Sequence, residues 1–208
     1  LADPILVSGG LGFIGRLSVE ALLQRGQAVA VFDVPGAPVP ARWGDRVRVL
    51  RGDIANADEV RAALDGIRTV LHTAAVVSDW APAAEHQRVT VEGSRHVFAE
   101  AARTGARVTL LSSCAVYGEH IGRRELREDL EPGRPIGAYS FYKQQQEALA
   151  WQFQRERGLK LSVVRPSKVF GPGSRPWVHE AAQALRRGSP PLVGGGDYNP
   201  GLVYVDNL

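Results

Sequence analysis

A tyrosine and a lysine four residues apart, Tyr139 and Lys143, form the pair best suited to acid–base chemistry in this sequence. They lie at the start of a segment, 139–157, that predicts a helix ending at Gly158, so both side chains share one helix face. The reference pKa of a phenol is about 10, and bringing it toward about 7 requires roughly 4 kcal/mol of phenolate stabilisation. A neighbouring ammonium favours the phenolate. Ser113 ends a neighbouring predicted strand and can hydrogen-bond to the same substrate oxygen.

A Tyr-x-x-x-Lys spacing alone is typical of a surface pair, so its function depends on the elements that precede it. The apolar run 5–7 leads into a glycine-rich turn, where Gly10, Gly12 and Gly15 have the spacing of the dinucleotide fingerprint. Glycines permit the tight turn and a close approach of the pyrophosphate, and the following helix offers free N–H donors. The alternative is an ordinary turn before a helix.

The second predicted strand, 28–32, supports the dinucleotide interpretation because it ends in Asp33, roughly 20 residues beyond the turn. A carboxylate there can accept hydrogen bonds from both hydroxyls of an adenosine ribose and would repel a 2′-phosphate. Val34 and Pro35 provide no arginine for such a phosphate, so the pattern favours NAD over NADP. A solvated carboxylate at a strand end is the alternative.

Strands and helices alternate along the chain. The predicted strands are 5–7, 28–32, 47–50, 69–75, 108–113 and 161–166. Helices are predicted near 56–65 with a cap near Asn56, at 85–103 with a stop at Gly105, at 139–157, and from Trp177 to Arg187. This order predicts an α/β fold, a doubly wound parallel sheet covered on both faces. Ligands bind such sheets beyond the carboxyl ends of the strands. The side chains expected there are Asp33, Asp53, Ala74, Ala75 and Ser113, beside the turn 9–15.

Composition excludes several other classes of protein. The 208 residues carry a formal net charge of +3 with scattered arginines, which predicts no nucleic-acid partner. The one cysteine, Cys114, excludes an internal disulfide, and nothing near it has metal-ligand spacing. No apolar run approaches the roughly 20 residues of a membrane span, and no signal-peptide pattern is present, so we expect no membrane and a cytoplasmic location.

A series of motifs in order resembles the extended short-chain dehydrogenases/reductases, the NAD-dependent epimerase/dehydratase family. The motifs are the glycine turn 9–15, Gly52-Asp53-Ile54, His72-Thr73-Ala74-Ala75, the segment 112–118, Tyr139 to Lys143, the segment 165–173 and Tyr204-Val205-Asp206-Asn207. The resemblance implies a Rossmann domain that binds NAD, which we place at residues 1–170. It also implies a smaller substrate-binding domain, whose start we place at 171–208 and which we expect to be truncated.

The resemblance also implies roles for individual residues. Tyr139 resembles the catalytic acid–base, Ser113 its partner, and Lys143 the residue that tunes the tyrosine and holds the nicotinamide ribose. Asp53 and Ile54 would flank the adenine, and no metal is implied. The cofactor-binding residues implied are Gly9, Gly12, Phe13, Ile14, Gly15, Asp33, Asp53, Ile54, Ala74, Ala75, Tyr139 and Lys143. A homodimer through the helices 85–103 and 139–157 is also implied.

Three departures from the family pattern bear on the substrate. Cys114 and Ala115 follow Ser113 in place of the Asp-Glu pair of sugar dehydratases, so 4,6-dehydration is disfavoured. Lys168 replaces the asparagine of many nucleotide-sugar members, either to meet a phosphate or as a surface residue. Thr90 replaces the family's asparagine in the long helix, which puts a contact near the active-site strand in doubt.

Lys168 in place of the asparagine, the loop at Trp80 and the ending Val205-Asp206-Asn207 favour a hydroxysteroid- or flavonol-type branch, which transfers a hydride between nicotinamide and a secondary alcohol or ketone of a small molecule. Trp80 then forms either a pocket wall or a surface loop aromatic. The first alternative is a nucleotide-sugar 4-epimerase with tightly bound NAD, which would use the same Tyr139, Ser113 and Lys143. The second is a non-catalytic NAD-binding protein.

Overall fold

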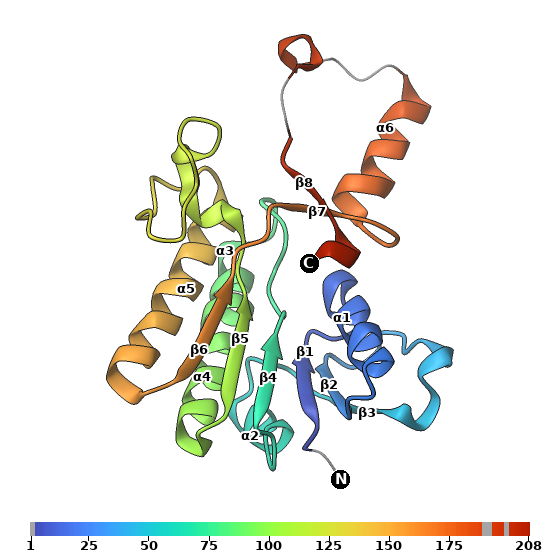
Figure 1. Cartoon of the computed structure of the whole chain (residues 1–208), viewed down its shortest axis with the longest axis vertical. Helices are drawn as coiled ribbons and strands as arrows, with labels where there is room; N and C mark the ends of the chain where they lie inside the picture. Colours follow the sequence, from blue (N-terminus) through green and yellow to red (C-terminus); the bar gives the residue numbers. More distant parts are fainter. Residues whose placement is uncertain (1–2, 189–192, 198–199) are drawn as a thin grey trace. The chain divides into compact units, whose positions relative to one another are not determined.

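The computed structural model describes residues 3–188, 193–197 and 200–208, so residues 189–192 and 198–199 of the expected second domain lie outside the described part. The chain divides into two compact units, 1–165 and 166–208. The first contains a six-stranded parallel sheet in the order β3-β2-β1-β4-β5-β6 (Figure 1). Its strands are β1 (Ile5–Ser8), β2 (Val29–Asp33), β3 (Val47–Arg51), β4 (Thr69–His72), β5 (Arg107–Leu111) and β6 (Lys160–Val164). The predicted doubly wound Rossmann fold is confirmed.

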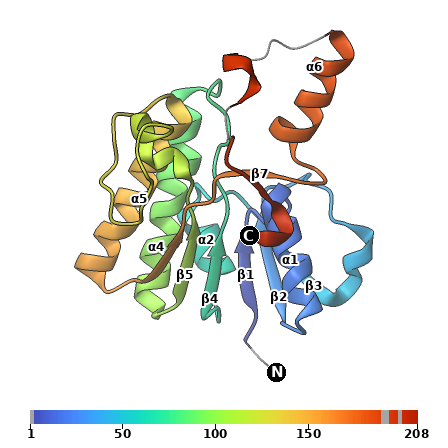
Figure 2. The same cartoon turned by 45° about the horizontal axis from the view of Figure 1, so that its top comes forward.

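Alternate residues of the strands pack against helices on opposite faces of the sheet. Val7, Val29 and Val31 pack with Val19 of α1 (Phe13–Gln24) and with the buried Trp43. Residues on the other face, among them Leu6, Val70 and Leu110, pack against α2 (Ala57–Ala63), α4 (Gly93–Thr104) and α5 (Ala138–Arg157). Figures 1 and 2 show α4 and α5 side by side. Burial on both faces explains why the strands read as nearly continuous apolar runs.

The strands near the candidate site end earlier than the sequence predicts. Residues 73–75 and 112–113 lie beyond the last paired residues of β4 and β5, His72 and Leu111. For β4 the cause is its neighbour β1, which ends at Ser8 because Gly9 adopts a φ of 73° and leaves the sheet. The side chains after these strands are therefore carried by loops at one edge of the sheet.

Local signals set the helix ends as predicted. Gly105 and Gly158 end α4 and α5 in the left-handed conformation, and the Asn56 side chain caps the start of α2. The predicted helix 85–103 consists of α3 (Ala83–Glu85), a wider π-helical turn (His86–Glu92) and α4. All its junction residues keep right-handed helical backbone angles, so these segments form one continuous rod.

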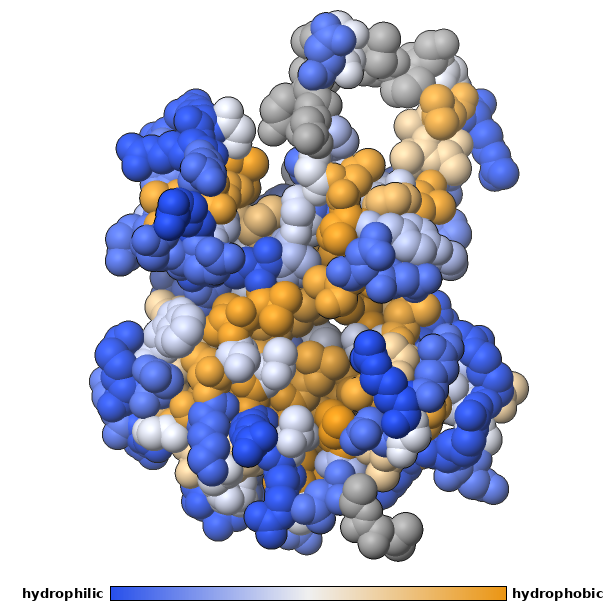
Figure 3. Space-filling model, in the orientation of Figure 1, coloured by the Kyte–Doolittle hydropathy of each residue, from blue (hydrophilic) through white to orange (hydrophobic). Residues whose placement is uncertain are grey.

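The sheet also carries partly exposed apolar side chains. Figure 3 shows an area of hydrophobic residues on the face drawn. Val164 of β6 is exposed, and Leu71 and Leu111 are only partly buried.

The second unit begins with β7 (Lys168–Phe170), which pairs in parallel with β8 (Leu202–Tyr204). β7 thus belongs to the second unit, although its residues fall within the first domain, 1–170, that the sequence predicts. Between these strands, a π-helical turn (Arg175–Glu180) continues into α6 (Ala181–Arg187), which confirms the helix predicted from Trp177 to Arg187.

Two kinds of feature are absent from the described residues. No helix there combines the length and the apolar character that a membrane span requires. No group of three or more His, Cys, Asp or Glu side chains is placed to hold a metal ion in that part of the chain.

Candidate active site

The glycine turn after β1 adopts a geometry that only small residues allow. A Cβ on Gly9 would lie 2.8 Å from the Cα of Ala74, so the turn after β1 lies directly against the segment after β4. A Cβ on Gly15 would clash with the carbonyl oxygen of Gly9, because the first turn of α1 packs on that turn. At Gly9 and Gly15 the turn thus has no room for a side chain, and its backbone forms a cradle.

This cradle fits a dinucleotide. Gly12 is the N-cap of helix α1 and provides no side-chain cap, so the N–H groups of Phe13 and Ile14 remain available for a diphosphate. The Nε of Arg16, in the same helical turn, is buried and has no hydrogen-bond partner in the described part of the chain. The Asp33 carboxylate accepts hydrogen bonds from the backbone N–H of Leu11 (2.7 Å) and of Val34 (2.8 Å), which leaves acceptor capacity for ribose hydroxyls.

Asp53 and Ile54, expected to flank an adenine, have partners within the chain. The Asp53 carboxylate pairs with Arg88 and accepts from the N–H of Ala55 (2.9 Å). Burial raises the pKa of Asp53, but the bonds from Ala55 and Arg88 outweigh it, so the net shift is downward. The Ile54 side chain is buried and packs closely against Gly93.

The segment after β4, which contains Ala74 and Ala75, is fastened by side chains. The N–H of Val76 donates to the Thr90 hydroxyl (3.0 Å), so this threonine does make a contact at the active-site strand. The His86 ring donates to the carbonyl oxygen of Ser78 (2.8 Å), since a carbonyl can only accept.

Ser113 and Tyr139 are brought together by the structure. Ser113 follows β5; its side chain accepts from the N–H of Ala115 (3.1 Å) and lies close enough to the Tyr139 phenol to lower the pKa of that group. The Ser140 hydroxyl donates to the carbonyl oxygen of Ala115 (2.7 Å), which ties the start of α5 to the turn after Ser113. Two segments distant in sequence thus place two hydroxyls at one point.

Asp79 is a residue of this site that the sequence did not single out. Its carboxylate accepts from the backbone N–H of Tyr139 (2.9 Å), in the first turn of α5. Burial raises the pKa of Tyr139, the hydrogen bond with Ser113 lowers it, and the charges of Cys114 and Asp79 raise it again. The net shift is upward, because burial disfavours the phenolate more than the bond with Ser113 favours it.

Lys143 lies one helical turn beyond Tyr139 and is almost fully buried. Its ammonium donates to the carbonyl oxygen of Leu111 (3.0 Å) and to the Gln146 side chain (2.8 Å). Burial lowers the pKa of Lys143 to about 7, against the opposing influence of Glu147. Lys143 is therefore held from β5 and from its own helix.

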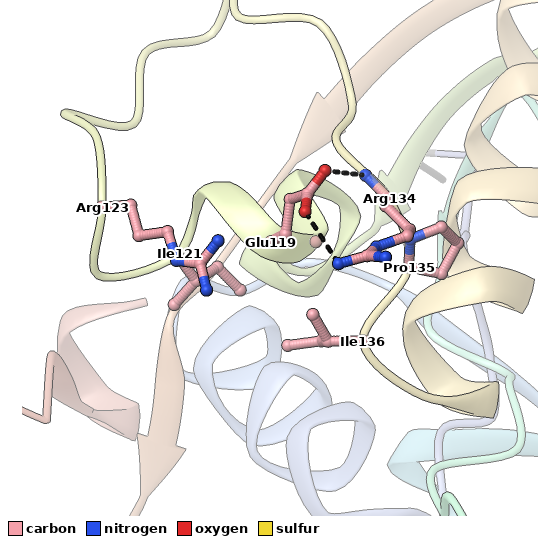
Figure 4. A pocket seen from close by; sticks show the side chains of 7 residues that line it. Glu119, Ile121, Arg123, Arg134, Pro135 and Ile136 are labelled. Atoms are coloured by element: carbon pink, nitrogen blue, oxygen red, sulfur yellow. Dashed lines mark hydrogen bonds and ion pairs between the residues drawn. The ribbon is translucent and has the colours of Figure 1, made fainter.

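A cavity of about 580 Å³ lies before the start of α5 (Figure 4). Its lining residues are Gly118, Glu119, Ile121, Arg123, Arg134, Pro135 and Ile136. Arg134 pairs with Glu119 (3.2 Å), and Ile136 is 63% exposed. Next to Asp79 in sequence, the side chains of Val77 and Trp80 are 69% and 95% exposed, so Trp80 belongs to an exposed loop.

A parallel sheet with a glycine cradle after β1 and an acid at the end of β2 defines a Rossmann-type dinucleotide-binding protein. The chain belongs to the NAD dependent epimerase/dehydratase family, whose model matches residues 5–208. The predicted family is therefore confirmed, and the predicted cofactor agrees with it.

Relatives and solved structures cover several branches of this family. The chain is 31% identical to the human sterol-4-alpha-carboxylate 3-dehydrogenase, decarboxylating, over 100% of this chain and 56% of that protein. It is 30% identical to a 3-beta-hydroxysteroid dehydrogenase of Mycolicibacterium neoaurum, over 98% and 58%. The UDP-glucuronic acid 4-epimerase of Bacillus cereus, solved with UDP-glucuronic acid and NAD, matches with a TM-score of 0.83 and 25% identity over 98% of this chain and 69% of that one. The chain spans little more than half the length of these curated relatives.

Proposed function

We propose that this chain is the NAD-binding and catalytic part of an oxidoreductase that transfers a hydride between NAD and a secondary alcohol or ketone of a small molecule. The observation that carries the proposal is the placement of the Ser113 hydroxyl beside the Tyr139 phenol, at the edge of the sheet that holds the glycine cradle. Lys143, buried one turn further along α5, completes the set. Under this proposal residues 1–170 bind NAD and 171–208 begin a substrate-binding domain.

Each residue has a defined task in alcohol oxidation. When bound, oxidised NAD accepts the hydride, and its positive nicotinamide favours a phenolate. The Ser113 hydroxyl hydrogen-bonds to the substrate oxygen and orients it toward Tyr139. The Tyr139 oxygen takes the hydroxyl proton, and in ketone reduction it returns that proton. The Lys143 ammonium stabilises the negative charge on Tyr139 and would hold the nicotinamide ribose.

The remaining cofactor contacts follow from the cradle. Gly9, Gly12 and Gly15 with the N–H groups of Phe13 and Ile14 would hold the diphosphate, and Asp33 the adenosine ribose. Ala74 and Ala75 would line the middle of the cofactor, and Asp53 and Ile54 the adenine.

Exposed apolar side chains near Tyr139 support an apolar substrate of the hydroxysteroid or flavonol type. Val77 and Trp80 flank Asp79, whose carboxylate bonds to the Tyr139 backbone, and Ile136 lies three residues before Tyr139. In the second unit, the Lys168 ammonium donates to the carbonyl oxygen of Pro200 (2.7 Å) and so has a partner other than a phosphate. The sterol and hydroxysteroid dehydrogenases among the relatives agree with this substrate class.

The second candidate, a nucleotide-sugar 4-epimerase, is favoured by the likeness to solved structures such as the Bacillus cereus epimerase. The two functions differ in how they treat NAD. An epimerase regenerates the cofactor in place, so protein purified without added NAD and then denatured should release nearly stoichiometric NAD. A dehydrogenase should release little and should form NADH when supplied with NAD and secondary alcohols.

The catalytic assignment is tested by Tyr139→Phe, with Tyr142→Phe as the matched control. Tyr142 lies on the same helix but stacks on His86 (4.7 Å between ring centroids), away from Ser113. Loss of a positioned acid–base group should reduce kcat by about 10²–10⁴-fold in Tyr139→Phe. Tyr142→Phe should retain activity, and both variants should still bind NAD in a fluorescence titration. Unchanged activity in Tyr139→Phe would refute the assignment.

A homodimer through α4 and α5 is part of the proposal. These helices pack against each other, and Phe141 of α5 is 43% exposed. Sedimentation should give a dimer mass, and a monomer mass at every concentration would reject the pairing.

A further inference from the structure

A series of buried hydrogen bonds extends from Lys143 on α5 to Ser8 at the end of β1. The Lys143 ammonium donates to Gln146 Oε1 (2.8 Å), and Gln146 Nε2 donates to the hydroxyl of Ser94 on α4 (2.7 Å). Ser94 Oγ lies 2.8 Å from His72 Nε2, and His72 Nδ1 lies 2.7 Å from the hydroxyl of Ser8 on β1. All five side chains are at most 3% exposed. The chain thus crosses β4, α4 and α5 without reaching water.

Counting hydrogens fixes the direction of every bond in this chain. An ammonium can only donate, so Gln146 must turn its oxygen to Lys143 and its NH₂ group to Ser94. The Ser94 hydroxyl has one hydrogen, which goes to the carbonyl oxygen of Thr90 at 2.6 Å, because a carbonyl has none to give. Ser94 therefore accepts from both Gln146 and His72. His72 must carry its proton on Nε2, and Ser8 donates to the bare Nδ1.

Electrostatics agree with a neutral His72 in this arrangement. Burial and the nearby charge of Lys143 lower the pKa of His72 to about 3. The charged group that acts on Lys143 is Glu147 on its own helix, and Tyr139 lies one turn before it. Glu147 already neutralises Arg165 in a buried pair, so Gln146 is the side chain that hydrogen-bonds directly to the ammonium.

The end of this hydrogen-bonded series that is farthest from Lys143 lies at the glycine cradle. Ser8 is the last residue of β1 and directly precedes Gly9. Its carbonyl oxygen accepts from both the N–H (3.0 Å) and the hydroxyl (2.8 Å) of Thr73, so this point is fixed from β4 as well. The same network therefore contacts Lys143 at one end and the cradle at the other.

We propose that Gln146 is a positioning residue for Lys143, and that the directed chain through Ser94, His72 and Ser8 ties this lysine to the end of β1 beside the cradle. Two of the three ammonium hydrogens are bound, to Leu111 and to Gln146, so the direction of the third is fixed. A buried ammonium that is already held in place can stabilise the Tyr139 phenolate and hydrogen-bond to the ribose without first changing its own position. The proposal rests on the proposed catalytic role of Lys143.

Three consecutive glutamines provide matched variants. Gln146 binds Lys143, Gln144 donates to the carbonyl oxygens of Val116 and Gly133, and Gln145 is exposed. Gln146→Leu removes the acceptor of the ammonium at similar volume, and Gln145→Leu makes the same change one residue away on the surface. Gln144→Leu removes two partly buried bonds that do not involve Lys143 and controls for general loss of stability.

The readout is the titration of Lys143 by NMR in protein carrying labelled lysine. Lys143, Lys160 and Lys168 are the lysines of the sequence, so each signal can be assigned by single substitution. Loss of a hydrogen bond to a charged group should lower the pKa of Lys143 by about one unit in Gln146→Leu. It should also reduce kcat about tenfold, because less of the protein carries a charged lysine. Gln145→Leu and Gln144→Leu should leave the pKa of Lys143 unchanged. Gln146→Glu keeps an acceptor for the ammonium and adds a negative charge, so it should raise the pKa of Lys143.

A folded Gln146→Leu variant with an unaltered Lys143 titration would overturn the proposal. The unsubstituted protein offers a second test that does not depend on a variant folding: ¹⁵N spectra should show His72 neutral at pH 5 with its proton on Nε2. A proton on Nδ1 would overturn the direction of the chain. Neither measurement needs substrate, so failure of the proposed function, seen as Tyr139→Phe with unchanged activity, is distinguishable from failure of this inference.

Discussion

The buried pair of Glu147 and Arg165 should contribute strongly to the stability of the first unit. Glu147 on α5 is 6% exposed and Arg165, just after β6, is 16% exposed. The carboxylate accepts from Arg165 Nε (3.0 Å), the Ser112 hydroxyl (2.6 Å) and Trp151 Nε1 (3.1 Å). Glu147→Gln removes the charge and turns an NH₂ group toward at least one of these donors.

The expected cost follows from the partner that remains. Arg165 keeps its bonds to the Tyr117 hydroxyl (2.9 Å) and to the carbonyl oxygen of Glu128 (3.0 Å), but its charge is left without an anion in a buried site. Breaking one side of a buried ion pair costs about 3–5 kcal/mol. For a chain of this length that corresponds to a fall in Tm of about 6–20 °C. The assay is urea unfolding followed by circular dichroism.

Two controls separate the pair from a general effect on α5. Glu156→Gln, at an exposed position of the same helix, should change the unfolding free energy by less than about 0.5 kcal/mol. Replacing both Glu147 and Arg165 by methionine should restore much of the loss, because no uncompensated charge remains. A cost below about 1 kcal/mol for Glu147→Gln would refute the reasoning.

The cost should also depend on pH. Burial raises the pKa of Glu147, but the hydrogen bonds from Arg165, Ser112 and Trp151 outweigh it, so the folded-state pKa is lowered. The stabilisation is therefore fully present above the unfolded pKa of about 4.3 and is lost as the pH falls through the folded value. The difference between wild type and Glu147→Gln should be constant near neutral pH and should shrink below about pH 4.

Three further predictions concern the candidate site. Asp79→Asn keeps an acceptor for the Tyr139 N–H but removes a negative charge, so the limb of the kcat–pH profile that reports Tyr139 should move to lower pH; a move to higher pH would contradict the electrostatic argument. Gly15→Ala should abolish NAD binding in a titration, because its Cβ would clash with the Gly9 carbonyl, and retained affinity would show that the cradle is not the cofactor site. Asp33→Asn should weaken NAD binding and raise the affinity for NADP relative to NAD by about tenfold, since a charge that repels a 2′-phosphate is removed; an unchanged ratio of dissociation constants would contradict the assigned preference.

The order of strands and helices was predictable because each signal is local. The apolar runs, the glycines that end α4 and α5 and the Asn56 cap depend only on neighbouring residues, and all are found as expected. The spacing of Tyr139 and Lys143 likewise predicted a shared helix face, and the motif order identified the family.

The contacts that surround these residues were not predictable, because they join segments far apart in the chain. Asp79 bonds to the backbone of Tyr139, sixty residues away, and the sequence marks it only as a loop acid. Gln146 could be placed on the face of Lys143 by its spacing, but its bond to Ser94 depends on how α5 packs on α4. The upward shift in the pKa of Tyr139 depends on burial, which no motif reports.

The π-helical turn His86–Glu92 has a consequence for the lengths that this chain can tolerate. A π turn holds one residue more than an α turn, and here two of its own residues, His86 and Thr90, make the hydrogen bonds that fasten the segment after β4. Deleting one residue within it would let the rod become regular α-helix, but everything before the deletion would rotate by about 100° relative to α4. The two fastening side chains could then no longer face the same loop, so natural variants of this chain should keep the number of residues between Ser78 and Ser94 constant even where the residues themselves change.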